Sequence, residues 1–211
     1  MAVDSVPLES LREDRVIAVV RGSRVADPAG LARTFVANGI RCVEYTFTIP
    51  DILSAIRAST DGGALVGAGT VLVPEQARQA IDAGARFVVT PTVRADVVDT
   101  CLDLDVPVIL GAFSPTEVRT AVEVGAAAVK LFPARVGGPE YIRDLLAPFP
   151  DLSLIPSGGV GPENLRSYLD AGALAVYIGT SLAPPDAVES GNLREIARRA
   201  ALIRTALQTP A

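Results

Sequence analysis

Residues 106–134 read VPVILGAFSPTEVRTAVEVGAAAVKLFPA, and this stretch contains one complete unit of the fold that we predict. It begins with a short apolar, β-branched run (106–113) and ends with another (128–134), and each run is typical of a buried strand. Between them, Ser114-Pro115 is typical of a helix start and Gly125 of a helix end. The stretch therefore predicts a strand, a helix and a second strand.

The same unit recurs along the chain. The strand-like runs occupy eight ranges at even intervals: 16–22, 42–47, 65–71, 87–91, 106–113, 128–134, 152–160 and 174–182. Helix starts with proline recur at Pro28, Pro74 and Pro162, and the segments between the runs often end at glycine. Eight such βα units predict an α/β fold, a compact (β/α)8 TIM barrel that forms a single domain over residues 1–211.

Two further features complete the predicted architecture. Residues 5–14 are expected to form one short extra N-terminal helix that closes the bottom of the barrel, and residues 192–208 the last helix. An open, doubly wound sheet is the alternative. It is less favoured because no GxGxxG motif follows the first strand.

Composition agrees with a sheet covered by helices and excludes several functions. Aromatic residues make up only 5% of the 211 residues, so the core must consist of Val, Leu, Ile and Ala. The net charge of −5 argues against nucleic acid as a partner. No apolar run approaches the ~20 residues of a membrane span and no secretory signal is visible, so we expect no membrane partner and a cytoplasmic location.

Residues with special chemistry are few. Cys42 and Cys101 lie far apart in apolar surroundings, so we expect two reduced, buried thiols. Histidine is absent, which makes zinc- or histidine-dependent chemistry improbable, and we predict no metal site. Lys130 is the single lysine, whereas the other cationic side chains are all arginine. Unlike arginine, a buried lysine loses its proton readily and can act as an amine nucleophile.

Active sites of such barrels form at the C-terminal ends of the strands. The charged residues embedded in the predicted strands are Arg21, Glu44 and Lys130. One interpretation is a buried ion pair that only braces the barrel. The other is catalytic: Lys130 in a dry pocket forms a Schiff base, Glu44 moves protons, and Arg21 holds a substrate carboxylate or orients Glu44.

Two glycine-bearing loops form a second predicted site. PSGGVGPEN (156–164) places Gly158 and Gly159 before a helix that starts with proline, and IGTS (178–181) follows on the next strand. Backbone N–H groups at a helix start favour phosphate, and barrel enzymes frequently hold phosphate after strands seven and eight. We therefore expect a phosphate-binding end to the site.

Several motifs together resemble a known family. VVRG (19–22), VEYTFTIPD (43–51), VGAGTVL (66–72), VKLFPA (129–134) and PSGGVGPENL (156–165) are similar, in this order and spacing, to the 2-keto-3-deoxy-6-phosphogluconate (KDPG) / 4-hydroxy-2-oxoglutarate (KHG) aldolases. The resemblance covers about residues 10–185. It implies a class I aldolase on a (β/α)8 barrel, a homotrimer, and a phosphorylated keto acid and pyruvate as small-molecule partners. It implies no metal or organic cofactor.

The resemblance also assigns roles to residues. It implies that Lys130 forms the imine and that Glu44 is the general acid/base. It implies that the substrate is contacted by Arg21, Thr70, Pro91, Phe132, Thr48 and Ser157, and the phosphate by Gly158, Gly159, Gly179 and Thr180. Some members carry an arginine at the position of Thr48, where it helps to bind the substrate carboxylate. Here we expect Arg21, Thr70 or the backbone to bind that carboxylate instead.

Alternatives stay open at this stage. The 6-phosphogalactonate aldolases share the Thr90-Pro91 and GPxYI features, so the sugar epimer is undecided. A phosphosugar epimerase or isomerase on the same barrel would use carboxylates without an imine. A non-catalytic metabolite-binding or assembly protein would use the Lys130–Glu44 pair for structure alone. Tyr177 could narrow the phosphate pocket or point into the barrel wall.

Overall fold

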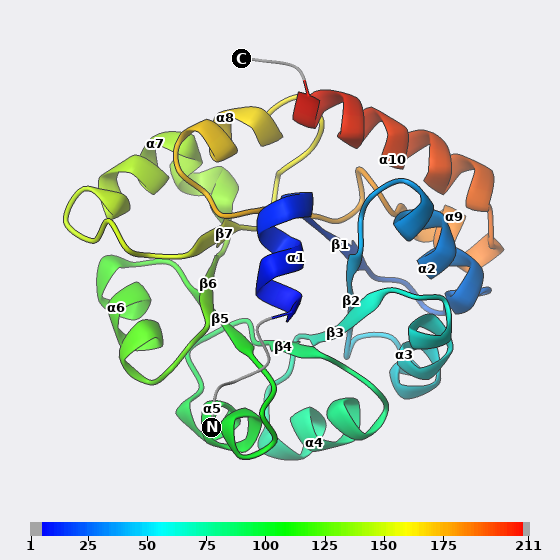
Figure 1. The fold of residues 1–211 in the computed structure, drawn as a ribbon, viewed down its shortest axis with the longest axis horizontal. Helices are drawn as coiled ribbons and strands as arrows, with labels where there is room; N and C mark the ends of the chain where they lie inside the picture. Colours follow the sequence, from blue (N-terminus) through cyan, green and yellow to red (C-terminus); the bar gives the residue numbers. More distant parts are fainter. Residues whose placement is uncertain (1–5, 209–211) are drawn as a thin grey trace.

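Parallel strands alternate with helices along residues 6–208, the part of the chain that the computed structural model describes (Figure 1). The strands are β1 (Val16–Val20), β2 (Cys42–Thr46), β3 (Leu65–Gly69), β4 (Phe87–Val89), β5 (Val108–Ala112), β6 (Ala128–Leu131), β7 (Leu154–Pro156) and β8 (Val176–Ile178). The helices are α1 (Val6–Asp14), α2 (Pro28–Ala37), α3 (Ile52–Asp61), α4 (Pro74–Asp82), α5 (Ala95–Asp103), α6 (Pro115–Glu123), α7 (Ala134–Leu146), α8 (Leu165–Asp170), α9 (Pro185–Ser190) and α10 (Leu193–Gln208).

The strands form one parallel sheet that curves into a barrel. Its order is β7-β6-β5-β4-β3-β2-β1-β8, so each strand lies beside its neighbour in sequence and β1 pairs with β8. The remaining gap is bridged where the backbone N–H of Leu174, just before β8, donates to the carbonyl of Leu154 in β7 at 2.8 Å. The predicted (β/α)8 barrel is confirmed, and the open doubly wound sheet is excluded.

Helix α1 closes the bottom of the barrel, as the sequence predicts. Figure 1 shows it lying across the middle of the ring of strands. Leu11 of α1 is fully buried and packs with Ile17, Cys42 and Phe87 inside the barrel. Residue 5, which we assigned to this helix, lies outside the described residues.

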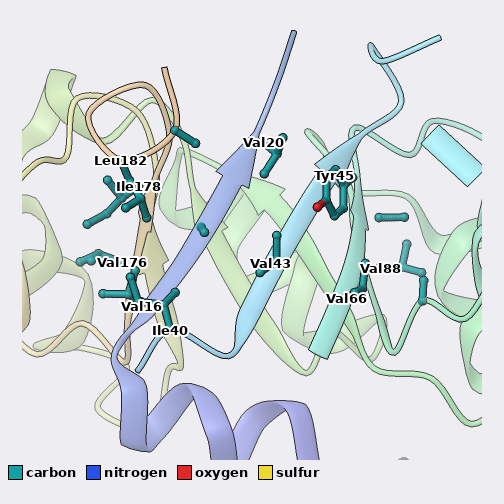
Figure 2. Close-up of a cluster of buried hydrophobic side chains, with 14 of the residues drawn as sticks. Val16, Val20, Ile40, Val43, Tyr45, Val66, Val88, Val176, Ile178 and Leu182 are labelled. Carbon is teal, nitrogen blue, oxygen red and sulfur yellow. The ribbon is translucent and has the colours of Figure 1, made fainter. Parts of the chain in front are cut away.

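Most of the hydrophobic core lies between the strands and the outer helices. Alternate residues of each strand face this layer, for example Val16, Ala18 and Val20 of β1, each fully buried. Figure 2 shows Val43, Tyr45 and Val66 of the adjacent strands in the same layer. The intervening residues of β1, Ile17 and Val19, belong to the separate cluster inside the barrel. Two apolar layers are therefore separated by one sheet.

Local signals placed most of the helix ends. The Asp27 carboxylate accepts from the backbone N–H of Gly30, and Ser114 with Glu117 forms a capping box at the start of α6. Gly39, Gly84, Gly125 and Gly172 end helices with φ values between 72° and 106°, in the region where glycine is favoured. These features confirm the predicted starts at Asp27-Pro28 and Ser114-Pro115 and the four glycine stops. The start predicted at Pro162 is wrong, because residues 162–164 form a turn and α8 begins at Leu165.

The structure differs from the sequence prediction in three further places. The strands are shorter than the apolar runs, because the last residues of each run, and the first two residues of the runs 106–113, 152–160 and 174–182, lie outside the strand. Helix α9 was not predicted. Helix α7 consists of two helical stretches that meet at Gly138 (φ 66°, ψ −170°), and Pro139, which has no N–H to donate, begins the second stretch.

The described residues contain no helix that is both long and apolar enough to cross a membrane. Cys42 and Cys101 are buried and unpaired, as expected. Burial raises the pKa of both thiols to about 12, so they remain protonated at neutral pH.

Candidate active site

Two glycines of β3 make room for side chains of neighbouring strands inside the barrel. A Cβ atom at Gly69 would lie 2.0 Å from Oε1 of Glu44, and one at Gly67 would lie 2.1 Å from the Phe87 ring. Gly69 is paired in register with Thr46, two residues beyond Glu44 on β2. The Glu44 carboxylate therefore occupies the space that any other residue at position 69 would fill.

Lys130 lies on the interior face of β6 and is 4% exposed. Its strand neighbours in register are Gly111 of β5 and Ile155 of β7. A Cβ atom at Gly111 would lie 2.3 Å from the backbone carbonyl of Pro91. Because Gly111 has no side chain, the backbone of Pro91 approaches the strand beside Lys130.

The two predicted catalytic side chains face each other. Lys130 Nζ lies 3.7 Å from Glu44 Oε2, and the two side chains are 5% and 0% exposed. This distance is an ion-pair contact, longer than a direct hydrogen bond. Burial lowers the pKa of Lys130; the nearby Glu44 opposes this shift and the positive charge of Arg21 adds to it. The lysine therefore gives up its proton more easily than a lysine in water.

Tyr177 completes this group from β8. Its ring centroid lies 4.7 Å from Lys130 Nζ, and the residue is 1% exposed within the interior cluster. Of the two orientations left open by the sequence, Tyr177 does not point into the barrel wall: it points into the barrel interior, where it contacts the lysine and borders the pocket. Its hydroxyl and both carboxylate oxygens of Glu44 are buried without a hydrogen-bond partner. Such polar atoms are costly in a core and indicate a place where a polar molecule binds.

A pocket of about 330 Å³ opens beside this group. Its lining includes seven of the predicted substrate and phosphate residues, contributed by the C-terminal ends of four strands: Arg21, Phe132, Ser157, Gly158, Gly159, Gly179 and Thr180. Tyr177 also lines the pocket and thereby links it to Lys130. Lys130 and Glu44 do not line the pocket themselves, and Tyr177 is the residue that lies between them and the predicted phosphate end.

The glycine loop after β7 has a conformation that favours glycine. Gly158 and Gly159 have φ values of 91° and 85°. A Cβ atom at Gly159 would also lie 2.7 Å from Cβ of Arg135. Glycine at these two positions therefore lets the backbone itself form the pocket wall.

Three predicted substrate residues do not line this pocket. Thr48 is exposed, and its hydroxyl is hydrogen-bonded to that of Thr46 at 2.6 Å. Thr70 and Pro91 are half-buried; Thr70 directly follows Gly69 and has φ 59°. Their roles remain predictions.

Two residues that the sequence analysis did not single out also matter. Glu163 lines the pocket and places a carboxylate beside the predicted phosphate residues. Val19, in the interior cluster, lines the pocket from β1. Glu163 lies inside the PSGGVGPENL motif, so its position in sequence was a usable signal. The alternation of β1 could have indicated Val19.

A barrel of eight βα units with a lysine–carboxylate pair buried in its interior is an arrangement suited to barrel enzymes that act through a lysine amine. Residues 8–199 match the family model described as KDPG and KHG aldolase. The chain belongs to this family, whose members are carbon–carbon lyases.

Individual relatives agree. The chain is 38% identical over 192 residues to the 2-dehydro-3-deoxy-phosphogluconate aldolase of Treponema pallidum, covering 89% of this chain and 91% of the relative. It is 35% identical over 171 residues to the 2-dehydro-3-deoxy-6-phosphogalactonate aldolase of Escherichia coli K12, covering 79% and 83%. The KDPG aldolase of Legionella pneumophila, solved with pyruvate captured as a covalent carbinolamine, superposes with a TM-score of 0.85 at 27% identity, covering 93% and 97%.

Proposed function

We propose that this protein is a class I, Schiff-base aldolase that cleaves 2-keto-3-deoxy-6-phosphogluconate to pyruvate and glyceraldehyde 3-phosphate. The observation that carries the proposal is the buried Lys130–Glu44 pair, 3.7 Å apart and joined to a glycine-walled pocket through Tyr177. The covalent pyruvate carbinolamine described for the Legionella relative supports the same chemistry.

The reaction begins at Lys130. Its neutral Nζ attacks the keto carbon, and Glu44 returns a proton to the departing hydroxyl, so that water leaves and a protonated imine forms. The depressed pKa of Lys130 favours this step, because the neutral amine is present at lower pH than in a free lysine.

Cleavage follows from the charge on the imine. Glu44 takes the proton from the hydroxyl next to the bond that breaks, and that carbon–carbon bond releases its electron pair into the imine. An aldehyde leaves and an enamine remains. Glu44 then returns its proton to the enamine carbon, and water hydrolyses the imine to pyruvate and free Lys130. No step needs a metal or an organic cofactor.

The pocket next to Lys130 would hold the far end of the substrate. Backbone groups of Gly158, Gly159 and Gly179 line it with the side chain of Arg21, which offers a positive charge. Glu163 lies on the same pocket and opposes a dianion. The attraction of a phosphate by the positive charge of Arg21 and its repulsion by the negative charge of Glu163 therefore act against each other. Their balance sets how strongly the pocket favours a phosphate over an uncharged group.

Two other keto acids could undergo the same cleavage and belong in the same assay. 4-Hydroxy-2-oxoglutarate would give pyruvate and glyoxylate, and the 6-phosphogalactonate-derived epimer is supported by the relative from Escherichia coli. We would assay all three substrates for pyruvate release. Preference for both phosphorylated substrates over 4-hydroxy-2-oxoglutarate supports the phosphate pocket. Equal rates would contradict it, and no release from any of them would contradict the aldolase proposal.

A Lys130→Arg variant separates the aldolase from a phosphosugar epimerase or isomerase. Arginine keeps the positive charge but cannot form an imine, so we expect no pyruvate release. Turnover that survives this substitution would favour a carboxylate-based reaction without an imine.

We also propose that the enzyme is a cytoplasmic homotrimer, as the family resemblance implies. Exposed apolar side chains give this proposal a physical basis: Val136 is 66% exposed, and Leu72 and Val73 are 44% and 42% exposed. Light scattering coupled to size-exclusion chromatography should give three times the mass of one chain. A single-chain mass at micromolar concentration would contradict it.

A further inference from the structure

Tyr177 is the one aromatic side chain recorded in contact with the lysine cation among the described residues. We propose that Tyr177 is a positioning residue that holds the charged nitrogen of Lys130 against the face of its ring, first as ammonium and then as protonated imine. The imine part of this inference rests on the proposed function, whereas the ammonium part stands on the geometry of the free enzyme.

The fold fixes the ring at this place. Ala175, Tyr177 and Gly179 alternate along and beyond β8, so all three share the interior side of the barrel. A Cβ atom at Gly179 would meet nothing within 4 Å, so the next interior position of this strand is free of neighbouring atoms. The ring itself is 1% exposed and belongs to the interior cluster with Leu11 and Ile17. The ring is therefore held in place by this packing.

The contact has the geometry of a cation–π interaction. Lys130 Nζ lies 4.7 Å from the ring centroid, inside the ~6 Å range in which the ring quadrupole attracts a cation. Both side chains are at least 95% buried, so solvent screens this attraction little. Buried cation–π contacts are the strong ones, because the ammonium has already lost its water.

Three groups act on the Lys130 nitrogen from different strands. Glu44 on β2 attracts it, the positive Arg21 after β1 repels it, and the Tyr177 ring on β8 attracts it. Glu44 is the proposed proton carrier, so it alternates between the charged carboxylate and the neutral acid during the reaction. The ring carries no titrating charge near neutral pH, because burial and Glu44 raise the pKa of Tyr177 well above its ordinary value. The neighbouring Cys42 thiol, with a pKa of about 12, is also neutral. The ring attraction is therefore constant.

The single lysine makes a direct test possible. Protein labelled with ¹³C at lysine Cε gives one side-chain signal, from Lys130, whose shift reports its protonation. We would titrate wild type, Tyr177→Phe and Tyr177→Leu. The phenylalanine variant keeps the ring and is the matched control, so its midpoint should equal that of wild type. The leucine variant loses the ring, so its midpoint should fall by about one pH unit.

Two results would overturn the proposal: an unchanged midpoint in Tyr177→Leu, or an equal fall in both variants, which would assign the effect to the hydroxyl. Circular dichroism checks that each variant is folded, and Tyr177→Met, which fills the space with a flexible side chain, replaces the leucine variant if that one does not fold. Methionine should give the same fall.

Trapping with pyruvate and borohydride across pH then tests the imine part. The acid limb of adduct formation should move to lower pH in Tyr177→Leu by the same amount as the NMR midpoint. Wild type that forms no adduct would refute the proposed function, while the NMR titration would still decide the role of the ring. If the wild type forms the adduct and its adduct formation falls at the same low pH as in the leucine variant, the proposed role of the ring is refuted. The aldolase proposal would then stand.

Discussion

The lower and upper halves of the barrel interior are built in opposite ways. The lower half is apolar: Leu11, Ile17, Cys42 and Phe87 are at most 1% exposed and fill it together. The upper half contains a buried lysine and a buried carboxylate, and the lysine nitrogen lies against the Tyr177 ring. Of the four buried polar side-chain atoms that lack a partner among the described residues, three belong to Glu44 and Tyr177. The lower half is filled by its own apolar side chains, whereas the upper half holds the charged pair for which we propose a substrate.

This comparison predicts that changes above should affect activity and changes below should affect stability. Glu44→Gln keeps the size of the side chain but removes the proposed proton carrier. We expect kcat to fall by about 10²–10⁴-fold. The measurement is pyruvate release under saturating substrate. Near-normal kcat would mean that Glu44 only braces Lys130. The matched variant Lys130→Met/Glu44→Gln should remain folded, because it removes both charges together.

Leu11→Ala should lower the stability of the protein and leave its activity unchanged, the opposite of Glu44→Gln. Leu11 is fully buried below the site, so its truncation should lower the free energy of unfolding by about 2–5 kcal/mol, while kcat of the folded enzyme is retained. Leu202→Ala on α10 is the control: Leu202 is 48% exposed, and we expect a change within about 0.5 kcal/mol. Urea denaturation gives both values. A folded Leu11→Ala protein without activity would break the comparison.

The smallest expected effect concerns the pocket wall. Gly159→Ala should raise KM for a phosphorylated substrate by about tenfold, comparable to one lost hydrogen bond to a charged group. The reason is strain at φ 85° and the contact with Arg135. Gly63 has a similar φ of 82° with nothing near its side-chain position, and it lies outside the pocket. Gly63→Ala should therefore have similar backbone strain, without the side-chain contact, and keep a normal KM. Steady-state kinetics would contradict us if the two variants shifted KM alike.

Local chemistry explains why much of the fold could be predicted. Apolar runs, prolines at helix starts and glycines at helix ends act within a few residues, so β1 to β8 and their order were predictable. Helix α9 was missed because six residues give little periodicity. The kink in α7 was not predicted, although the Gly138-Pro139 pair is visible in the sequence.

The sequence could single out residues for the candidate site, and their roles stay predictions; their geometry was less predictable. The uniqueness of Lys130 and the lone embedded carboxylate pointed to the pair that the structure places 3.7 Å apart. The sequence left the direction of Tyr177 open, because the direction depends on where β8 closes against β1. The exposure of Thr48 depends likewise on the loop after β2, which carries no periodic signal. Contacts between distant strands are set by barrel closure and not by neighbours in sequence.

The central claim is that Lys130 forms an imine with the keto acid, and borohydride reduction in the presence of pyruvate tests it most directly. Because Lys130 is the single lysine, intact mass and peptide mapping identify the site without ambiguity. We predict one reduced pyruvate adduct per chain on the peptide that contains Lys130, and none in Lys130→Arg. A wild-type enzyme that releases pyruvate from its substrate but acquires no adduct at Lys130 would contradict the account.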